Sequence, residues 1–100
     1  MVLEVAILNV PQADRDDFED AFGRAQAIIA SMPGYGRHEL RRCIETEGRY
    51  LLLVWWRDLE SHTVGFRGSP EYREWKRLLH HFYDPFPEVE HYTPLYEGVA

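Results

Sequence analysis

Four segments of the chain carry apolar positions in patterns that predict strands. Residues 2–10 are apolar on both faces, except for Glu4 on one face and Asn9 on the other. A buried Glu4 would need a polar partner. Residues 50–56 are apolar almost throughout, which is typical of a strand covered on both sides. These two segments are therefore expected to form the middle of a sheet.

The other two strands have polar patterns. Residues 35–45 alternate charged side chains, so this strand is expected either at a sheet edge or against another subunit through salt bridges. Glu47-Gly48 is expected to be the hairpin turn into the strand that follows. Residues 88–96 form a last strand, which Pro94 restricts to an edge or to an arm that reaches a neighbour.

Three stretches show the helical period. Asp14 can cap a long helix that ends at a Pro-Gly turn. Its apolar stripe consists of Phe18, Ala21, Phe22, Ala25, Ile28, Ile29 and Met32. Asp58 can cap a short helix over residues 58–66, and Ser69 followed by Pro70 is typical of the start of another helix. The stripe of that helix consists of Tyr72, Trp75, Leu79 and Phe82, before a Pro-interrupted bend.

The resulting order is β-α-β-β-α-β with the second helix split, which predicts an α+β, ferredoxin-like fold over a single domain, residues 1–100. Helices on one face of the sheet leave the other face bare. That face carries too many apolar residues to remain in water, so we expect two sheets to pack face to face in a twofold-symmetric homodimer.

Composition narrows the possible partners and the compartment. The 100 residues carry a formal net charge of −6, which argues against nucleic acid or an anionic membrane as the main partner. The single cysteine fits a reducing compartment. The N-terminal apolar run lacks a basic region before it, and no run approaches the length of a membrane span. We therefore expect a cytoplasmic protein.

The chain has no Gly-rich phosphate loop, Cys-x-x-Cys or G-x-S-x-G motif, so a built-in flavin or nicotinamide site is not expected. His62 is a candidate general base facing a pocket, with local capping or packing as the alternative. The adjacent His80 and His81 point about 100° apart on a helix, so they do not predict a metal site. Asn9 either binds a substrate oxygen or holds the turn after its strand.

A dense aromatic set offers walls for a cavity that accepts a flat aromatic molecule, with simple core packing as the alternative. Its members are Trp55, Trp56, Phe66, Trp75, Phe82, Tyr83, Phe86 and Tyr92. Trp55 and Trp56 point to opposite faces of their strand, so at most one of them lines a given cavity.

The stretch Val54–Trp75 resembles the antibiotic biosynthesis monooxygenase domain. The resemblance is carried by Trp55, His62, Phe66, Ser69, Tyr72 and Trp75, and it extends over nearly the whole chain. It implies a dimeric α+β barrel with a pocket between helices and sheet in each subunit. The family includes cofactor-independent oxygenases of quinols and anthrones, in which the deprotonated substrate itself passes an electron to dioxygen.

The family also includes heme-degrading enzymes that use an Asn in the first strand, a Trp on the short helix and a His on the next helix. In this chain those positions are occupied by Ala6, Phe66 and Lys76 (or Arg77 one place on), so none of the three residue types is present. The resemblance therefore disfavours heme, and neither a cofactor nor a metal is expected.

We interpret the sequence as a cofactor-independent monooxygenase that uses dioxygen on a small quinol- or anthrone-like compound. His62 is the expected base, and His81 or Asn9 is expected to stabilise the substrate anion. The expected walls of the site are Trp56, Phe66, Trp75, Tyr83 and Tyr92. The alternative is a non-enzymatic dimer that binds an aromatic ligand or heme.

Overall fold

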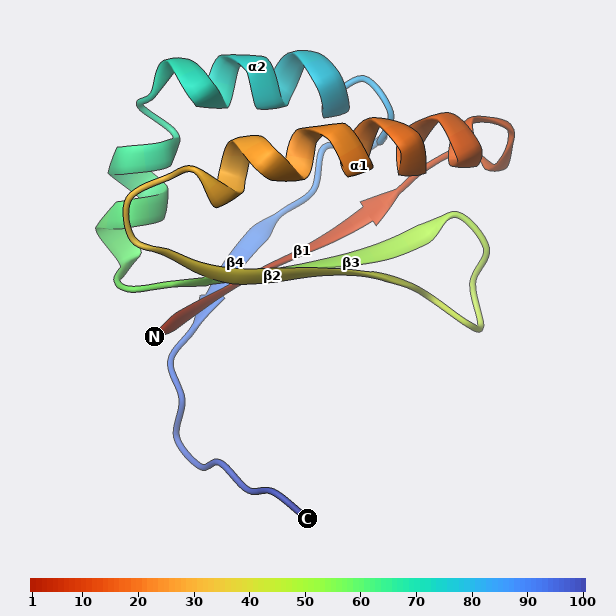
Figure 1. Cartoon of the computed structure of the whole chain (residues 1–100). Helices are drawn as coiled ribbons and strands as arrows, with labels where there is room; N and C mark the ends of the chain where they lie inside the picture. The colour runs from red at the N-terminus through yellow and green to blue at the C-terminus, as the bar shows by residue number, and fades with distance from the viewer.

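The computed structural model describes all 100 residues, and it forms an antiparallel four-stranded sheet with helices on one face (Figure 1). The strands are β1 (Val2–Asn9), β2 (Tyr35–Arg42), β3 (Arg49–Trp56) and β4 (Val89–Tyr92). The helices are α1 (Arg15–Ala30), the π-helix η2 (Ser61–Phe66) and α2 (Pro70–Leu79), with a single 3-10 turn, η1 (Gln12–Asp14), before α1. Neither α1 nor α2 has the length and hydropathy needed to cross a membrane.

The sheet order β2-β3-β1-β4 confirms the ferredoxin-like prediction. β1 pairs along its whole length with β3, from Val2 opposite Trp56 to Asn9 opposite Arg49. β4 pairs with the other side of β1 and places His91 opposite Glu4. The two strands with the strongest apolar patterns therefore lie in the middle, and the two polar strands lie at the edges, as expected.

The core lies between the sheet and the helices. The helix-facing side of β1 carries Glu4, Ala6 and Leu8, all buried, whereas Ile7 on the other side is half exposed. The predicted stripe of α1 packs against this side through Phe18, Ala21, Phe22, Ala25 and Ile29. Alternation along β1 thus places one carboxylate inside the core.

Side-chain caps fix the two short helices near the site. Asp58 Oδ1 accepts hydrogen bonds from the backbone N–H and the hydroxyl of Ser61, at 2.8 and 2.6 Å. Ser69 Oγ accepts the Tyr72 N–H at 3.1 Å, with Pro70 as the first residue of α2. Both predicted caps are confirmed. Asp14 precedes α1 as expected, but its carboxylate makes no capping hydrogen bond.

Several predicted boundaries were too wide. β2 ends at Arg42 rather than Glu45, and the connection to β3 is a six-residue loop, residues 43–48, rather than a two-residue turn. α2 ends at Leu79, before Phe82. The last strand covers Val89–Tyr92 instead of residues 88–96, because only this stretch pairs with β1.

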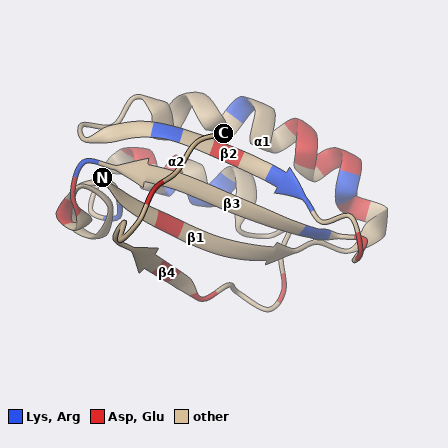
Figure 2. Cartoon of the chain, turned by 90° about the horizontal axis from the view of Figure 1, so that it is seen from below, with Lys and Arg blue, Asp and Glu red and all other residues tan.

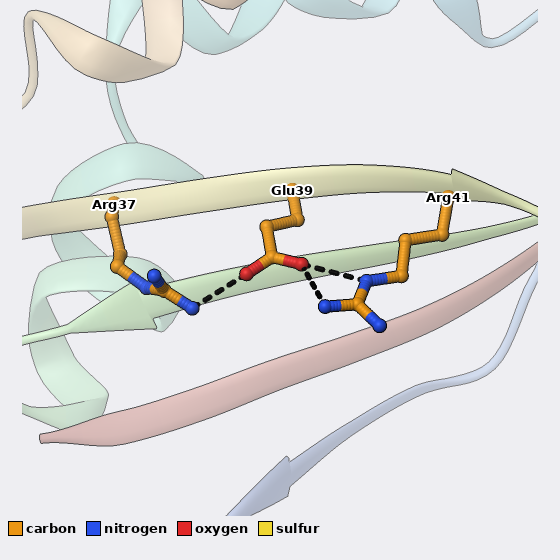
Figure 3. Close-up of polar contacts among 3 residues, drawn as sticks. All are labelled: Arg37, Glu39 and Arg41. Carbon is orange, nitrogen blue, oxygen red and sulfur yellow. Dashed lines mark hydrogen bonds and ion pairs between the residues drawn. The ribbon is translucent and has the colours of Figure 1, made fainter.

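The sheet face away from the helices is open, and the C-terminal segment extends away beneath it (Figure 1). The only charged residues of β1 and β3 are Glu4, which is buried on the helix side, and Arg49 at the start of β3, whereas β2 carries charges of both signs (Figure 2). On β2, Glu39 lies between Arg37 and Arg41 and pairs with both, with its Oε1 2.6 Å from Arg41 Nε (Figure 3). The Arg37 guanidinium also lies 3.9 Å above the Trp55 ring. The edge strand thus shields the apolar middle with paired charges.

Candidate active site

A small cavity lies between the helix-facing side of the sheet and the η2–α2 segment. Its volume is about 50 Å³, which is room for a few water molecules. It is lined by Glu4, Ala6, Ile29, Leu52, His62, Phe66, Arg67, Tyr72, Trp75, His80, Tyr83, Phe86, Pro87 and Val89. The lining is mostly apolar and aromatic with a few convergent polar groups, which is the usual composition of a small-molecule site.

Glu4 is the buried carboxyl group of this cavity, with only 6% of the residue exposed. Trp56 donates its indole N–H to Glu4 Oε1 at 2.9 Å. His62 Nε2 lies 3.4 Å from the same oxygen. Alternation along β1 directs Glu4 inward, and Trp56 reaches it from the neighbouring strand, so the partner that a buried Glu4 requires is present.

His62 is held between Glu4 and His91. It is 3% exposed, and its ring stacks on Trp56 with the centroids 5.4 Å apart and an interplanar angle of 16°. Its Nδ1 atom lies 2.7 Å from Nε2 of His91 on β4. Both ring nitrogens of His62 therefore have polar neighbours, and no buried polar side-chain atom of the chain lacks a hydrogen-bond partner.

Burial dominates the protonation of this cluster. Desolvation raises the pKa of Glu4 from 4.5 to about 7, although the Trp56 hydrogen bond and the Arg67 charge oppose the shift. Desolvation also lowers the pKa of His62 from 6.5 to about 3, with further lowering by Arg67 and His91. Desolvation and the Arg67 charge also lower the pKa of His91. Near pH 7 the histidines are neutral, and Glu4 exchanges a proton readily.

The π-helix places His62 and Arg67 at the same cavity. The Arg67 backbone N–H donates to the His62 carbonyl at 3.1 Å, five residues back, which is the spacing of a π-turn. The Arg67 side chain is exposed at the cavity and forms no ion pair. An unpaired guanidinium beside buried acid–base groups is positioned to attract a negative charge.

Two tyrosines and His80 complete the polar lining. Burial raises the pKa of Tyr72 and of Tyr83, so both hydroxyls keep their protons at neutral pH. Neither hydroxyl hydrogen-bonds to another protein group, so each is free to donate to a bound molecule. Burial lowers the pKa of His80 to about 4, and its ring contacts Tyr72, Tyr83 and Phe86.

Five of the residues expected at the site lie at the cavity or directly behind it. His62, Phe66, Trp75 and Tyr83 line the cavity together. Trp56 does not line it but lies behind Glu4 and His62, as their hydrogen-bond donor and stacking partner.

Three of the expected residues do not reach the cavity. His81 follows the end of α2, is exposed, and its ring contacts that of Phe82 with the centroids 4.2 Å apart. Asn9 accepts from Arg49 Nε at 3.5 Å at the end of β1. Tyr92 is exposed, and its side chain accompanies Met1, Leu3 and Trp55 on the open face of the sheet.

Five polar residues to which the sequence assigned no site role lie at this cavity or in its polar cluster. They are Glu4, Arg67, Tyr72, His80 and His91. Glu4 did carry a signal, because it is the only charged residue in the strand-forming run of residues 2–10. No group of three histidine, cysteine or acidic side chains is arranged to hold a metal ion.

Comparison with known proteins gives consistent matches along the chain. The family model described as antibiotic biosynthesis monooxygenase matches residues 1–78. The uncharacterised protein YczJ of Bacillus subtilis (strain 168) is 55% identical over 92 residues, which cover 92% of this chain and 97% of YczJ.

Solved structures agree with the fold. A candidate antibiotic biosynthesis monooxygenase from Bordetella bronchiseptica is similar with a TM-score of 0.90 and 29% identity, over 95% of this chain and 97% of that one. SnoaB, a cofactor-independent oxygenase from Streptomyces nogalater, is similar with a TM-score of 0.77 and 25% identity, over 96% of this chain and 94% of SnoaB.

Proposed function

The chain belongs to the antibiotic biosynthesis monooxygenase family, and on this basis we propose that it is a cofactor-independent monooxygenase of a small quinol- or anthrone-like compound. The observation that carries the proposal is Glu4, a carboxyl group in an aromatic cavity whose pKa burial raises to about 7. A base with a pKa near the working pH is suited to removing the proton of an aromatic hydroxyl group. The similarity to SnoaB supports chemistry without a cofactor.

The proposed reaction begins with transfer of the substrate hydroxyl proton to Glu4. The substrate anion then gives an electron to dioxygen, and a carbon–oxygen bond forms. Cleavage of the resulting peroxide leaves one oxygen atom on the ring as a carbonyl group and releases the other as water. For an anthrone-type carbon the balance is CH₂ plus O₂ giving C=O plus H₂O, so no external reductant is consumed.

His62 is the base expected from the sequence, but in the proposed reaction the first proton acceptor is Glu4. Burial and the Arg67 charge lower the pKa of His62 to about 3, which makes its imidazole a weak base in this position. Arg67, Tyr72 and Tyr83 take the proposed task of stabilising the anion, which the sequence analysis gave to His81 or Asn9. Each of the three lines the cavity and has donors that no other side chain occupies.

Substrate size sets a further condition on the site. With about 50 Å³, the cavity accepts an aromatic ring only after side chains at its mouth move. Phe86 lines the cavity and is 61% exposed, so we propose that its side chain moves outward to admit the ring. A heme group would require a much larger separation of sheet and helices, which weighs against the heme-binding alternative.

We also propose that the protein is a homodimer built on the open sheet face. This face exposes Ile7 to 50%, and β1 and β3 carry few charges along it (Figure 2). The C-terminal segment beyond β4 adds exposed Leu95 and Tyr96 beneath the same face. A second copy would cover an apolar surface that is otherwise left in water.

Dioxygen uptake tests the enzymatic proposal. Purified protein is given a panel of hydroquinones and anthrones with no cofactor added, beside Glu4→Gln and His62→Ala variants. We expect uptake above the buffer rate in the wild type, with a loss of about 100-fold or more in Glu4→Gln. Uptake that is equal in all three proteins would remove both residues from the mechanism. No uptake across the panel would favour the alternative of a non-enzymatic ligand-binding dimer.

A further inference from the structure

A continuous line of polar contacts runs from the interior of the cavity to the edge of the sheet. It starts at Glu4 on β1, passes through His62 on η2 and ends at His91 on β4. His91 lies opposite Glu4 in the β1–β4 ladder, so the two side chains share the helix-facing side of the sheet. His91 is partly exposed, and its hydrogen bond to His62 uses Nε2, which leaves Nδ1 for solvent. The line therefore begins at a buried acid and ends at a nitrogen that can reach solvent.

We propose that His62 and His91 form a proton relay that connects the Glu4 carboxyl group to solvent while a bound substrate closes the cavity. The use of this relay in turnover rests on the oxygenase function proposed above. The connection itself rests on the three side chains alone, and it exists with or without a substrate.

The relay has two arrangements that differ by one proton. In the first, Glu4 is protonated and donates to His62 Nε2, His62 donates its Nδ1–H to His91 Nε2, and His91 carries a proton on Nδ1. In the second, Glu4 is ionised and accepts from His62 Nε2–H, while His62 Nδ1 accepts from His91 Nε2–H. One proton shifts along each contact, and one leaves His91 for water. Both imidazoles are neutral at the beginning and at the end.

The surroundings favour transfer without a charged intermediate. Arg67, which directly follows η2, lines the cavity and disfavours an imidazolium at either histidine. The other titratable groups at the cavity are Tyr72, His80 and Tyr83, from α2 and the segment after it. The tyrosines stay protonated and His80 stays neutral near pH 7, so none of them competes for the Glu4 proton.

Trp56 anchors the inner end of the relay. Its indole N–H can only donate, so Glu4 Oε1 accepts this hydrogen bond in both arrangements. The contact between His62 and His91, at 2.7 Å, already has hydrogen-bond length. The contact of 3.4 Å between Glu4 and His62 is the longest step, and it must shorten by about 0.5 Å to transfer a proton.

Histidine tautomers give a test that needs no substrate. Nitrogen NMR of uniformly labelled full-length protein, recorded from about pH 5.5 to about pH 8.5, distinguishes the Nδ1–H and Nε2–H forms of each ring. We expect His62 and His91 to change from Nδ1–H to Nε2–H together, with one midpoint that coincides with the titration of the Glu4 carboxyl carbon. Glu4→Gln is expected to abolish the coupled change in both rings.

Two results would overturn the relay. One is a Glu4 titration during which neither histidine changes its tautomer. The other is a His62 ring that becomes an imidazolium in this pH range. The readout remains valid when no oxygenase activity is found, so failure of the relay and failure of the proposed function are separable.

A second measurement tests the relay during turnover. We expect His91→Ala to lower the rate of dioxygen uptake by at least about tenfold near pH 7, with partial recovery when imidazole is added. Glu90→Gln is the matched control, because Glu90 lies next to His91 on β4 but is exposed and pairs with Tyr92. An active wild type with a His91→Ala variant of equal rate would show that the relay is not used.

Discussion

Trp56 on β3 and Glu4 on β1 are joined in the protein interior by a hydrogen bond of 2.9 Å from indole nitrogen to carboxyl oxygen. The contact is diagonal in the ladder, since Glu4 lies directly opposite Val54, two residues before Trp56. The indole N–H is thus a hydrogen-bond donor in a fixed position for a carboxyl group that burial removes from water. The bond thus orients Glu4 without forcing it to ionise, which leaves its protonation sensitive to pH.

The first prediction concerns the pH dependence of stability. Burial raises the pKa of Glu4 from 4.5 to about 7, so between these pH values the folded protein holds more protons than the unfolded chain. Its stability therefore falls as pH rises through this window. Glutamine does not titrate. The free energy of unfolding of Glu4→Gln relative to the wild type should therefore rise by up to about 3 kcal/mol as the pH is raised from 4.5 to about 7. Urea unfolding of both proteins at several pH values measures this difference.

His62 changes the pH dependence of stability in the direction opposite to Glu4. Burial lowers the pKa of His62 from 6.5 to about 3, so its contribution to stability is lost as pH falls through that range. In the wild type the two slopes oppose each other between the two ordinary pKa values, and in Glu4→Gln only the His62 slope remains. If the difference in unfolding free energy between the two proteins stays constant with pH, the pKa of Glu4 is not raised by burial.

The second prediction concerns Arg67, whose unpaired guanidinium faces the cavity. Arg67→Gln removes a charge that opposes the raised pKa of Glu4, so the Glu4 pKa should rise further and the pH profile of dioxygen uptake should move to higher pH. Because the side chain is exposed, the free energy of unfolding should change by less than about 0.5 kcal/mol. Arg67→Lys keeps the charge and should retain the wild-type profile.

The contradicting result for Arg67 is also specific. If Arg67→Gln and Arg67→Lys lower kcat/KM equally without a shift of the pH profile, Arg67 acts through shape rather than charge. The proposal that it stabilises a substrate anion would then be abandoned.

Local and periodic features of the sequence predicted the fold well. The stripe of α1, the caps at Asp58 and Ser69, and the opposite orientations of Trp55 and Trp56 all depend on neighbours within a few residues. The ends of β4 and α2 were predicted less well. They depend on how far pairing with β1 extends and on where the chain turns back, and neither is a local property.

The polar cluster of the site was the harder part to predict. Glu4, His62 and His91 come from three elements far apart in the sequence, and only the β1–β4 register brings the last of them to the first. The sequence identified His62 as a site residue and predicted that its imidazole is the base. The burial that lowers its pKa depends on tertiary packing, which the local sequence does not contain. His81 was expected at the site, and its neighbour His80 lines the cavity instead, because α2 ends one turn earlier than its apolar stripe indicates.

The third prediction concerns the cap of α2, which positions Tyr72 and Trp75 at the cavity. Ser69 accepts the Tyr72 N–H, so Ser69→Ala leaves that donor without its partner and should destabilise the protein by about 1 kcal/mol. Ser69→Asp supplies another capping oxygen and should retain most of the stability. Thermal or urea unfolding of the three proteins checks this, and equal stability of Ser69→Ala and wild type would show that the cap contributes nothing measurable.

The last prediction concerns the open face of the sheet. Ile7 is half exposed on the middle strand β1, among apolar residues that a second copy would cover in the proposed dimer. Ile7→Lys would bury an unpaired charge in that interface, so it should shift the protein from dimer to monomer at micromolar concentration while the fold is retained. Sedimentation velocity measures the oligomeric state, and circular dichroism confirms the fold.

Val64→Lys is the matched control for this test. Val64 is 68% exposed on η2, on the helix side of the molecule and away from the open face, so a charge there should leave the dimer intact. A wild type that sediments as a monomer, or an Ile7→Lys variant that remains a dimer, would show that the open face is not the contact between subunits. The paired charges of Arg37, Glu39 and Arg41 would then suffice to keep this face in solution, because they border the apolar strands along the β2 edge (Figure 3).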